Sequence, residues 1–391
     1  MPSRDDKKLQ ESIERLKNKG AAIRFSVIGA GHGGLAMAGH LAITGFPVKL
    51  YNRTDDKLHA VRWHGGISVS GEVNGFGKME CATSDIVRAV ENADVIMVVT
   101  PSTAHRSLAD AMAPHLTAGQ IVVLNPGRTG GALEFRERLN VARVTTPLFI
   151  TETQTFIYAS RATSAYEAHI HRIKNSVPIA TLPAYWIPQV LAVLTRAYPQ
   201  FVAGSNVLAT SLENIGAVFH PALTIMNAGW IEKTHGDFDY YLDGITPSIA
   251  KVLAEIDRER VAVATALGIR SVSAREWLYL SYDSPGKDLY EAIHNTESYR
   301  GIRAPQNIVH RYIFEDIPMS LVPLSSIGNM LGVSTPMIDT VIRLGSLMHG
   351  VDYAAEGRNV ERLGIAGMSI REIRNMVVGG AAGRARKGAA L

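Results

Sequence analysis

The stretch from residue 23 to residue 43 decides the fold, and it reads IRFSVIGAGHGGLAMAGHLAI. Its first six residues are mostly apolar and include β-branched side chains, which predicts a short buried strand. A glycine-rich turn follows at once from Gly29 to Gly34, and the alanine-rich sequence at 35–43 predicts a helix. Residues 48–51 predict a second strand. Together these elements make a βαβ unit, the unit from which parallel sheets are built.

The glycine turn has the spacing Gly-x-Gly-x-x-Gly between a predicted strand and a predicted helix, which is the context in which this spacing binds a dinucleotide. Gly29 permits the tight turn, Gly31 lets the backbone approach a pyrophosphate, and Gly34 allows close helix–strand packing. The pyrophosphate would meet N–H groups at the helix N-terminus. We therefore predict a nicotinamide dinucleotide site that includes Gly33 and, mainly through its backbone, His32. The alternative is a purely structural turn.

Strands and helices continue to alternate as far as residue 124. We expect strands at 67–69 and 78–81, with a possible hairpin around Asn74-Gly75, a short helix at 85–89, a strand at 94–99, a helix to about 116 and a strand at 121–124. Thr100 and Pro101 end the strand at 94–99, and we include both in the predicted cofactor site. The alternation predicts a doubly wound parallel sheet of the Rossmann type.

Beyond about residue 185 the strand signals fade. Residues 206–349 show mainly helical periodicity, broken at Pro247, Pro285, Pro305, Pro318 and Pro336. A chain of 391 residues favours more than one domain. We expect a charged N-terminal helix (1–21), a dinucleotide-binding domain (22–185), a mainly α-helical substrate and catalytic domain (186–378) and a disordered tail (379–391). The apolar character of residues 185–350 leads us to expect a homodimer.

Composition excludes several other classes of protein. The net charge is only +4 and no stripe of basic residues is visible, so we expect no nucleic-acid partner. The single cysteine, Cys81, excludes internal disulfides and multi-cysteine metal sites, and we expect no metal. No apolar run approaches the roughly 20 residues that cross a bilayer, and the first residues lack the apolar core of a signal peptide. We therefore expect a cytoplasmic protein without membrane contacts.

The end of the second strand bears on the choice of cofactor. An NAD site places an acidic residue there to bind the ribose 2′-hydroxyl. This chain has Asn52, Arg53 and Thr54 instead. The Arg53 guanidinium suits a 2′-phosphate, and Asn52 and Thr54 can donate hydrogen bonds. We therefore predict NADPH as the preferred cofactor and NADH as the alternative, which applies if Arg53 is only a solvated surface residue.

Two residues of the helical half attract attention as possible chemistry. His220 ends an apolar helical stretch and precedes Pro221, and Asp316 lies much later in the chain. From the residues alone, a histidine in this setting is more often structural than catalytic. Spacing in the sequence does not show that His220 and Asp316 meet.

Several segments carry a resemblance to a known family. They are LNPG at 124–127, GGALEF at 130–135, TSLEN at 210–214, HP at 220–221, YYLDGITPS at 240–248, YRGI at 299–302, RYIFED at 311–316, LVPLS at 321–325 and EGR at 356–358. Through these motifs, residues 22–375 resemble the opine dehydrogenases, the octopine/nopaline dehydrogenase family. Within it the chain is most similar to the bacterial N-(1-carboxyethyl)norvaline dehydrogenase branch.

The resemblance implies an oxidoreductase that reversibly condenses a 2-keto acid, commonly pyruvate, with an L-amino acid through an imine. It implies that His220 is the catalytic acid/base, that Asp316 pairs with it, and that Arg311 binds a substrate carboxylate. We also assign Asn214, within the TSLEN motif, to substrate binding. The norvaline branch has an acidic residue where this chain has Asn52, so its use of NADH does not transfer directly.

Two other functions fit the same organisation. One is a two-domain dehydrogenase of hydroxy compounds, such as glycerol-3-phosphate dehydrogenase or ketopantoate reductase, which uses a lysine as its acid/base. The helix before His220 offers no lysine, since Lys174 and Lys233 lie outside it. The other is a non-catalytic NADP(H) sensor.

Overall fold

The computed structural model of the chain describes residues 3–379, which divide into two compact units. Unit 1 runs to Thr210 and takes up the chain again from Glu372, and unit 2 spans Ser211–Arg371. Unit 1 thus extends past the boundary that we expected near residue 185, because a further strand (201–203) joins its sheet. Nearly all of the tail that we expected to be disordered lies outside the described residues.

The main sheet of unit 1 has eight strands in the order β12-β11-β8-β7-β6-β1-β2-β5. All of its pairings are parallel except β8 with β11. The strands are β1 Phe25–Ile28, β2 Val48–Tyr51, β5 Cys81–Thr83, β6 Val95–Val98, β7 Ile121–Leu124, β8 Phe149–Thr153, β11 Val177–Leu182 and β12 Phe201–Ala203. The predicted doubly wound sheet is therefore confirmed, with one antiparallel pairing that the sequence did not indicate.

A second sheet of four strands has the order β4-β3-β10-β9. Its strands are β3 Gly66–Gly71, β4 Gly75–Lys78, β9 Tyr158–Ala162 and β10 Glu167–Ile173. The hairpin around Asn74-Gly75 is present, but the single strand predicted at 78–81 is wrong. The chain passes from one sheet to the other there, because the Met79 N–H bonds to Gly65 and the Glu80 N–H bonds to Val48.

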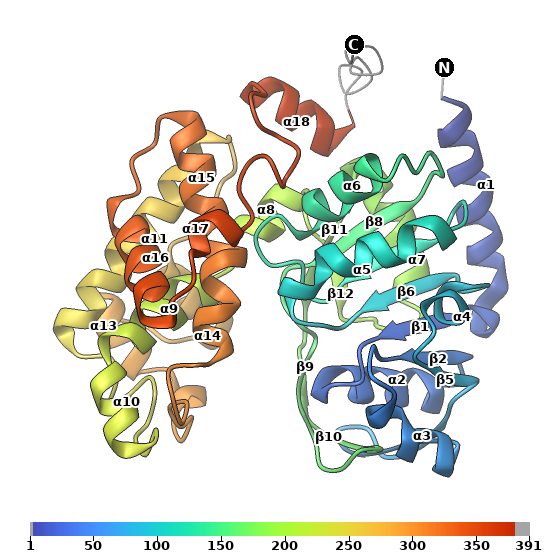
Figure 1. Cartoon of the computed structure of the whole chain (residues 1–391), viewed down its shortest axis with the longest axis horizontal. Coiled ribbons are helices and arrows are strands. Elements are labelled where there is room, and N and C mark those ends of the chain that lie inside the picture. Colours follow the sequence, from blue (N-terminus) through green and yellow to red (C-terminus); the bar gives the residue numbers. More distant parts are fainter. Residues whose placement is uncertain (1–2, 380–391) are drawn as a thin grey trace. The chain divides into compact units, whose positions relative to one another are not determined.

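Helices cover both faces of the main sheet. Helix α2 (His32–Ile43) lies between the two sheets. It packs on β1 and β2 of the main sheet and on the four-stranded sheet. Helix α7 (Ile187–Leu194) packs on β11 and β12, and α1 (Arg4–Lys19) packs on α7 in the place predicted for the charged N-terminal helix. Figure 1 shows α5 and α6 side by side over the sheet. The other α-helices in this part of the chain are α3 His59–His64, α4 Ile86–Val90, α5 His105–Met112, α6 Gly131–Val141 and α8 Val207–Leu212, the last of which crosses the boundary between the units.

Unit 2 is the predicted helical domain. Its helices are α9 Gly216–Met226, α10 Ala228–Thr234, α11 Pro247–Ala266, α12 Ala274–Tyr282, α13 Leu289–His294, α14 Arg311–Phe314, α15 Val322–Leu331, α16 Pro336–His349 and α17 Tyr353–Glu356, with a π-helical segment η7 at Ile317–Leu321. The final helix, α18, runs over Ile370–Val378 and belongs mostly to unit 1, which resumes at Glu372. Helix α9 packs against α11, α14 and α16. Pro247 and Pro336 begin their helices, as proline without an N–H prefers.

A buried ion pair holds the chain where it enters α9. Arg260 and Asp257, on one face of α11, are almost fully buried and lie 2.7 Å apart. The Arg260 guanidinium also donates to the carbonyl oxygens of Leu212 (2.7 Å) and Val272 (2.6 Å). Since a buried charge is costly without partners, these contacts fix the backbone just before α9.

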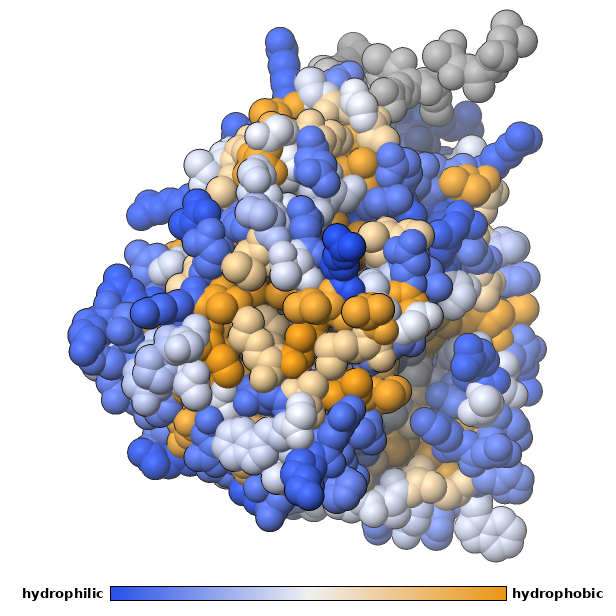
Figure 2. Space-filling model, turned by 60° about the vertical axis from the view of Figure 1, so that its left-hand side comes forward, coloured by the Kyte–Doolittle hydropathy of each residue, from blue (hydrophilic) through white to orange (hydrophobic). Residues whose placement is uncertain are grey.

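The surface carries exposed apolar side chains, which Figure 2 shows gathered in a patch near the middle of the view. In unit 2, Leu347 of α16 is 79% exposed and Val309 is 71% exposed. The homodimer stays a prediction, since a single chain does not test it. No helix among residues 3–379 is long and apolar enough to cross a membrane.

Candidate active site

The glycine turn has the geometry that a dinucleotide requires. Gly29 has φ +117°, and a Cβ there would lie 2.5 Å from the Val99 carbonyl oxygen. A Cβ on Gly34 would lie 1.7 Å from the carbonyl oxygen of Gly29. A Cβ on Gly31, by contrast, would meet nothing within 4 Å. Gly29 and Gly34 therefore serve internal packing, and Gly31 leaves open space beside the backbone for a ligand.

The N-terminus of α2 opens directly from this turn. Gly31 caps the helix without any side-chain hydrogen bond, and a helix leaves its first N–H groups without intrahelical acceptors. Such a terminus attracts a phosphate. The turn follows β1, while Thr100 and Pro101 follow the neighbouring strand β6, so both lie at the carboxyl edge where an open α/β sheet binds ligands. These residues fit a dinucleotide.

His32 and Gly33 have further contacts in unit 1. His32 Nδ1 accepts a hydrogen bond from the Ala162 N–H of β9 at 2.9 Å. The His32 ring thus links the glycine turn to β9, in addition to the part that its backbone plays in the turn. Gly33 leaves room for the Phe156 ring, which would lie 2.7 Å from a Cβ. Sequence reasoning missed Phe156 and Ala162, because nothing in the sequence indicates that residues so far apart lie beside the turn.

Of the residues that follow β2, Asn52 and Asp55 form hydrogen bonds within the chain, whereas Arg53 is exposed to solvent. Asn52 Oδ1 accepts from the Ala30 N–H at 3.2 Å and its amide donates to Thr54 Oγ1 at 3.0 Å, so Asn52 braces the glycine turn. The nearby Asp55 is held by two hydrogen bonds from Arg62, which with Ser84 lower the pKa of its carboxyl to about 2. The Asp55 carboxylate, three residues after Asn52, is thus already paired.

In unit 2 the structure brings His220 and Asp316 together across 96 residues of sequence. His220 Nδ1 lies 2.7 Å from Asp316 Oδ2. The Asp316 side chain is fully buried, whereas 17% of the His220 side chain is exposed. Asp316 directly precedes the π-helical segment η7, in which Pro318 has no N–H to donate to the preceding turn. π-Helical turns are frequent at functional sites.

Aromatic residues surround the imidazole of His220. Tyr312 stacks on it at 4.0 Å between ring centroids, and Tyr240 stacks on Tyr312 at 5.2 Å. The Tyr241 hydroxyl lies 3.1 Å from His220 Nε2. We did not assign Tyr241 or Tyr312 to the site from the sequence. Their presence in the YYLDGITPS and RYIFED motifs was the available signal.

Arg311 and Asn214 occupy different surroundings. Arg311 is 52% exposed and pairs with the buried Glu315 one helical turn later, at 3.0 Å. Asn214 is buried and its amide donates to the Ser320 hydroxyl of η7 at 2.8 Å. Burial, followed by Arg311 and His220, lowers the pKa of the neighbouring His310. The cationic Arg311 and the imidazoles of His220 and His310 thus lie close to two buried carboxylates, Glu315 and Asp316.

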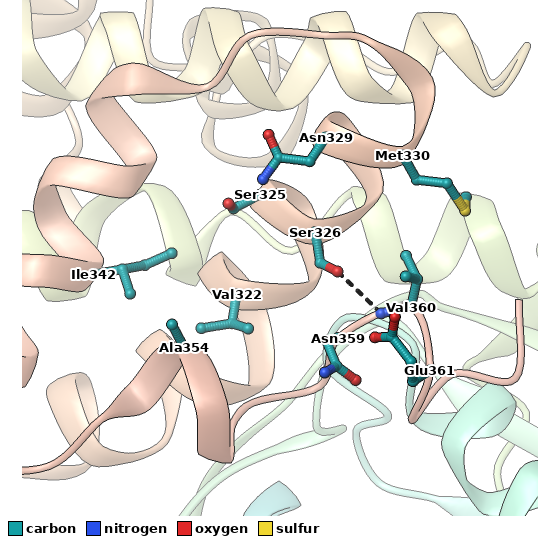
Figure 3. A pocket seen from close by; sticks show the side chains of 10 residues that line it. All are labelled: Val322, Ser325, Ser326, Asn329, Met330, Ile342, Ala354, Asn359, Val360 and Glu361. Atoms are coloured by element: carbon teal, nitrogen blue, oxygen red, sulfur yellow. Dashed lines mark hydrogen bonds between the residues drawn. The ribbon is translucent and has the colours of Figure 1, made fainter. Parts of the chain in front are cut away.

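Unit 2 also contains a cavity of about 380 Å³ between α15, α16 and the segment after α17. Figure 3 shows its lining, where the Ser326 hydroxyl accepts from the Val360 N–H at 3.0 Å. Its lining residues are not those in contact with His220, so we place the candidate chemistry at His220 and not in this cavity. Among residues 3–379, no group of histidine, cysteine or acidic side chains is arranged to hold a metal.

Comparison with known proteins gives two family matches. Residues 203–349 match the model described as NAD/NADP octopine/nopaline dehydrogenase, alpha-helical domain. Residues 24–127 match the NAD-dependent glycerol-3-phosphate dehydrogenase N-terminus. The chain is 39% identical to an opine dehydrogenase of Arthrobacter sp. (strain 1C), over 90% of this chain and 98% of that protein. It is 24% identical to the protein ocs of Agrobacterium tumefaciens (strain Ach5), with the same coverage of both chains.

Solved structures show the same fold. An octopine dehydrogenase with NADH and L-arginine has a TM-score of 0.76 at 20% identity, covering 92% of this chain and 98% of that one. A yersinopine dehydrogenase with NADP+ has a TM-score of 0.67 at 16% identity, covering 92% and 99%. A PanE/ApbA family ketopantoate reductase from Ralstonia eutropha scores 0.60 at 18% identity, covering 84% and 98%.

Proposed function

The chain belongs to the opine dehydrogenase family, and we propose that it condenses pyruvate with the amino group of an L-amino acid, with NADPH as reductant. It is an NAD(P)-dependent oxidoreductase that acts on the CH–NH group of donors. We also propose a position near the N-(1-carboxyethyl)norvaline dehydrogenase branch. The motifs that carry the family resemblance, such as TSLEN at 210–214 and RYIFED at 311–316, support that position.

The observation that carries the proposal is the bond between His220 Nδ1 and the buried Asp316. An amine attacks a keto carbon only when it is neutral, so a base must remove a proton from the substrate ammonium group. A histidine suits that task, because an imidazole can gain and lose a proton under near-neutral conditions. Asp316 accepts from Nδ1, which orients the ring and stabilises the imidazolium formed when His220 takes the proton.

The same His220 can return its proton to the oxygen that leaves as water when the imine forms. Bound NADPH would supply the hydride that reduces the imine carbon. The product is a secondary amine flanked by two carboxylates, and the reverse reaction uses the same groups in the opposite order. The geometry of His220 and Asp316, together with the family resemblance, supports these proposed roles.

A substrate with two carboxylates needs cationic partners, and we propose Arg311 as one of them. A guanidinium has five N–H donors in a fork that matches a carboxylate. The pairing with Glu315 holds the half-exposed Arg311 side chain in place. For Asn214 the substrate-binding assignment rests on the family motif, while its bond to Ser320 supports η7.

We predict that Arg311→Ala raises the KM of the keto acid about tenfold or more, because it removes a charge-assisted pair. The KM of NADPH should stay near the wild-type value. Steady-state kinetics with each substrate varied in turn measures both. Arg300→Ala is a matched control, since Arg300 is an exposed arginine of unit 2 that pairs with Glu297. An unaltered keto-acid KM would remove the proposed role of Arg311.

For the cofactor, we propose that Arg53 binds the 2′-phosphate of NADPH. Arg53 is exposed beside the turn, and Asp55 is engaged by Arg62 instead of being available for a ribose hydroxyl. Arg53→Ala should raise the KM of NADPH about 10-fold to 100-fold and leave that of NADH nearly unchanged, as expected for a charged hydrogen bond. Lys57→Ala, an exposed cation close by, is the control. Equal KM values for NADH and NADPH in the wild type would contradict the preference.

The decisive test of the function is a panel of 2-keto acids and L-amino acids, with NADPH and NADH oxidation followed in parallel. Turnover that requires both partners supports the proposal. Turnover with a keto acid alone would favour a dehydrogenase of hydroxy compounds, whose structures share part of this fold. No turnover with any pair would favour the NADP(H) sensor. We expect turnover that requires both partners, because the described contacts of the His220 side chain are with Asp316, Tyr241 and Tyr312 and include no lysine.

A further inference from the structure

The catalytic nitrogen of His220 already has a partner, the hydroxyl of Tyr241. A carboxylate only accepts hydrogen bonds, so the contact with Asp316 assigns the ring proton to Nδ1. Nε2 then carries the lone pair, and the Tyr241 O–H, 3.1 Å away, donates to it. This bond lies at the atom that has to take up the substrate's proton.

Tyr241 is held firmly in this position. The residue is only 7% exposed, and its ring stacks on Tyr299 at 4.2 Å between centroids. Tyr240 packs against the ring edge-on at 5.1 Å, as does Phe219 at 6.5 Å. Burial raises the pKa of the Tyr241 phenol well above its usual value, so the hydroxyl stays protonated. Tyr241 is therefore not a base, but it can take one proton while it gives up another.

The imidazole is equally constrained. Tyr312 stacks on one face of the His220 ring and Asp316 holds Nδ1, so Nε2 continues to face Tyr241. An imidazole nitrogen has one lone pair in the plane of the ring. A substrate ammonium group cannot donate to Nε2 while Tyr241 does.

We propose that Tyr241 relays the proton between the substrate amino group and His220, an inference that rests on the proposed function. The substrate N–H bond breaks as a new O–H bond forms at Tyr241 Oη, and the original Tyr241 O–H bond breaks as an N–H bond forms at His220 Nε2. The amine is left neutral, the imidazole becomes a cation beside Asp316, and Tyr241 ends as it began. The reverse transfer delivers the proton for the loss of water.

The test is Tyr241→Phe, which keeps the ring and removes only the hydroxyl. We expect kcat/KM for the amino acid to fall about 100-fold, in the range of a general acid–base contribution, while the KM of the keto acid changes little. The deficit relative to wild type should shrink as the pH is raised, because more of the amino acid is then neutral before it binds. A merely structural role gives a deficit that does not depend on pH.

Tyr240→Phe is the matched control. Its hydroxyl contacts Thr224 and the His220 carbonyl oxygen but not the ring nitrogens, so it should give no pH-dependent deficit. Suppose that the wild-type enzyme turns over, and that Tyr241→Phe either has the same kcat/KM or has a deficit that does not depend on pH. That result overturns the relay but not the proposed function. No wild-type turnover with any substrate pair overturns the proposed function and the relay with it. Should Tyr241→Phe fail to fold, ¹⁵N NMR of the wild-type ring decides, since a neutral imidazole protonated at Nε2 overturns the relay.

Discussion

Replacing His220 by alanine is expected to lower kcat about 10²-fold to 10⁴-fold, the range typical of a positioned acid/base. The variant loses the group that takes the proton from the substrate ammonium and the group that returns it for the loss of water. NADPH binding, measured by fluorescence titration, should be retained, because the glycine turn and Arg53 belong to the other unit. The loss in turnover should also diminish as the pH rises.

The alanine variant has a second effect that must be separated from the first. It leaves the Asp316 carboxylate buried without its imidazole partner, and removing one member of a buried pair destabilises a protein. His220→Asn avoids this, because the asparagine amide can donate to Asp316 in place of Nδ1 while nothing replaces Nε2. We expect it to lose as much activity with a smaller fall in melting temperature. Replacement of the exposed His235, a histidine outside the candidate site, is the control. A loss of turnover below about tenfold in both variants would contradict the acid/base role.

The cofactor-binding half of the molecule was largely predictable because its signals are local. The strand, the glycine turn and the helix follow one another within 23–43, and each has a pattern with a direct backbone meaning. The strands at 48–51 and 121–124 were predicted at their observed positions for the same reason. The crossing at Met79 and Glu80 was missed, since a chain that leaves one sheet for another keeps the same extended conformation.

The candidate catalytic cluster was not predictable from the residues alone, because its contacts are between distant parts of the chain. His220 and Asp316 are 96 residues apart, and neither lies in a motif whose spacing has a chemical meaning of its own. Only the resemblance to a family paired them. Tyr241 is 21 residues from His220, yet nothing in the order of residues shows that its hydroxyl reaches Nε2. Such contacts depend on how α9 packs against the segments that follow it.

Asn52 shows that the sequence can identify a position without showing what its side chain bonds to. The sequence pointed to this position as a cofactor contact, and the structure engages its side chain with the Ala30 N–H and with Thr54. An asparagine can support the glycine turn in this way because it offers an acceptor and donors on one planar group. An aspartate would keep the acceptor for Ala30 but lose the donor to Thr54. Asn52 thus supports the glycine turn, and Arg53 is left as the proposed cofactor contact.

Asp316→Asn is expected to reduce kcat about as strongly as the loss of His220, although it keeps the shape of the side chain and replaces only one oxygen by nitrogen. The amide of an asparagine can donate to Nδ1, which moves the ring proton to Nε2 and leaves His220 unable to accept from Tyr241. In the Ser-His-Asp triad the same exchange lowers kcat about 10⁴-fold for this reason. Steady-state kinetics over a range of pH measures the effect, and we expect a loss of about 10²-fold to 10⁴-fold.

The pH profile distinguishes this mechanism from a general disturbance of the helical unit. Removing an anion beside an imidazole disfavours the imidazolium, so the acid limb of the remaining activity should move to lower pH. Asp339→Asn makes the same chemical change on α16, where the carboxylate accepts from the Ser325 hydroxyl at 2.5 Å, and should leave the profile in place. An Asp316→Asn enzyme with wild-type turnover would mean that the tautomer of His220 does not matter. Proton transfer at Nε2, and the relay through Tyr241, would then both be wrong.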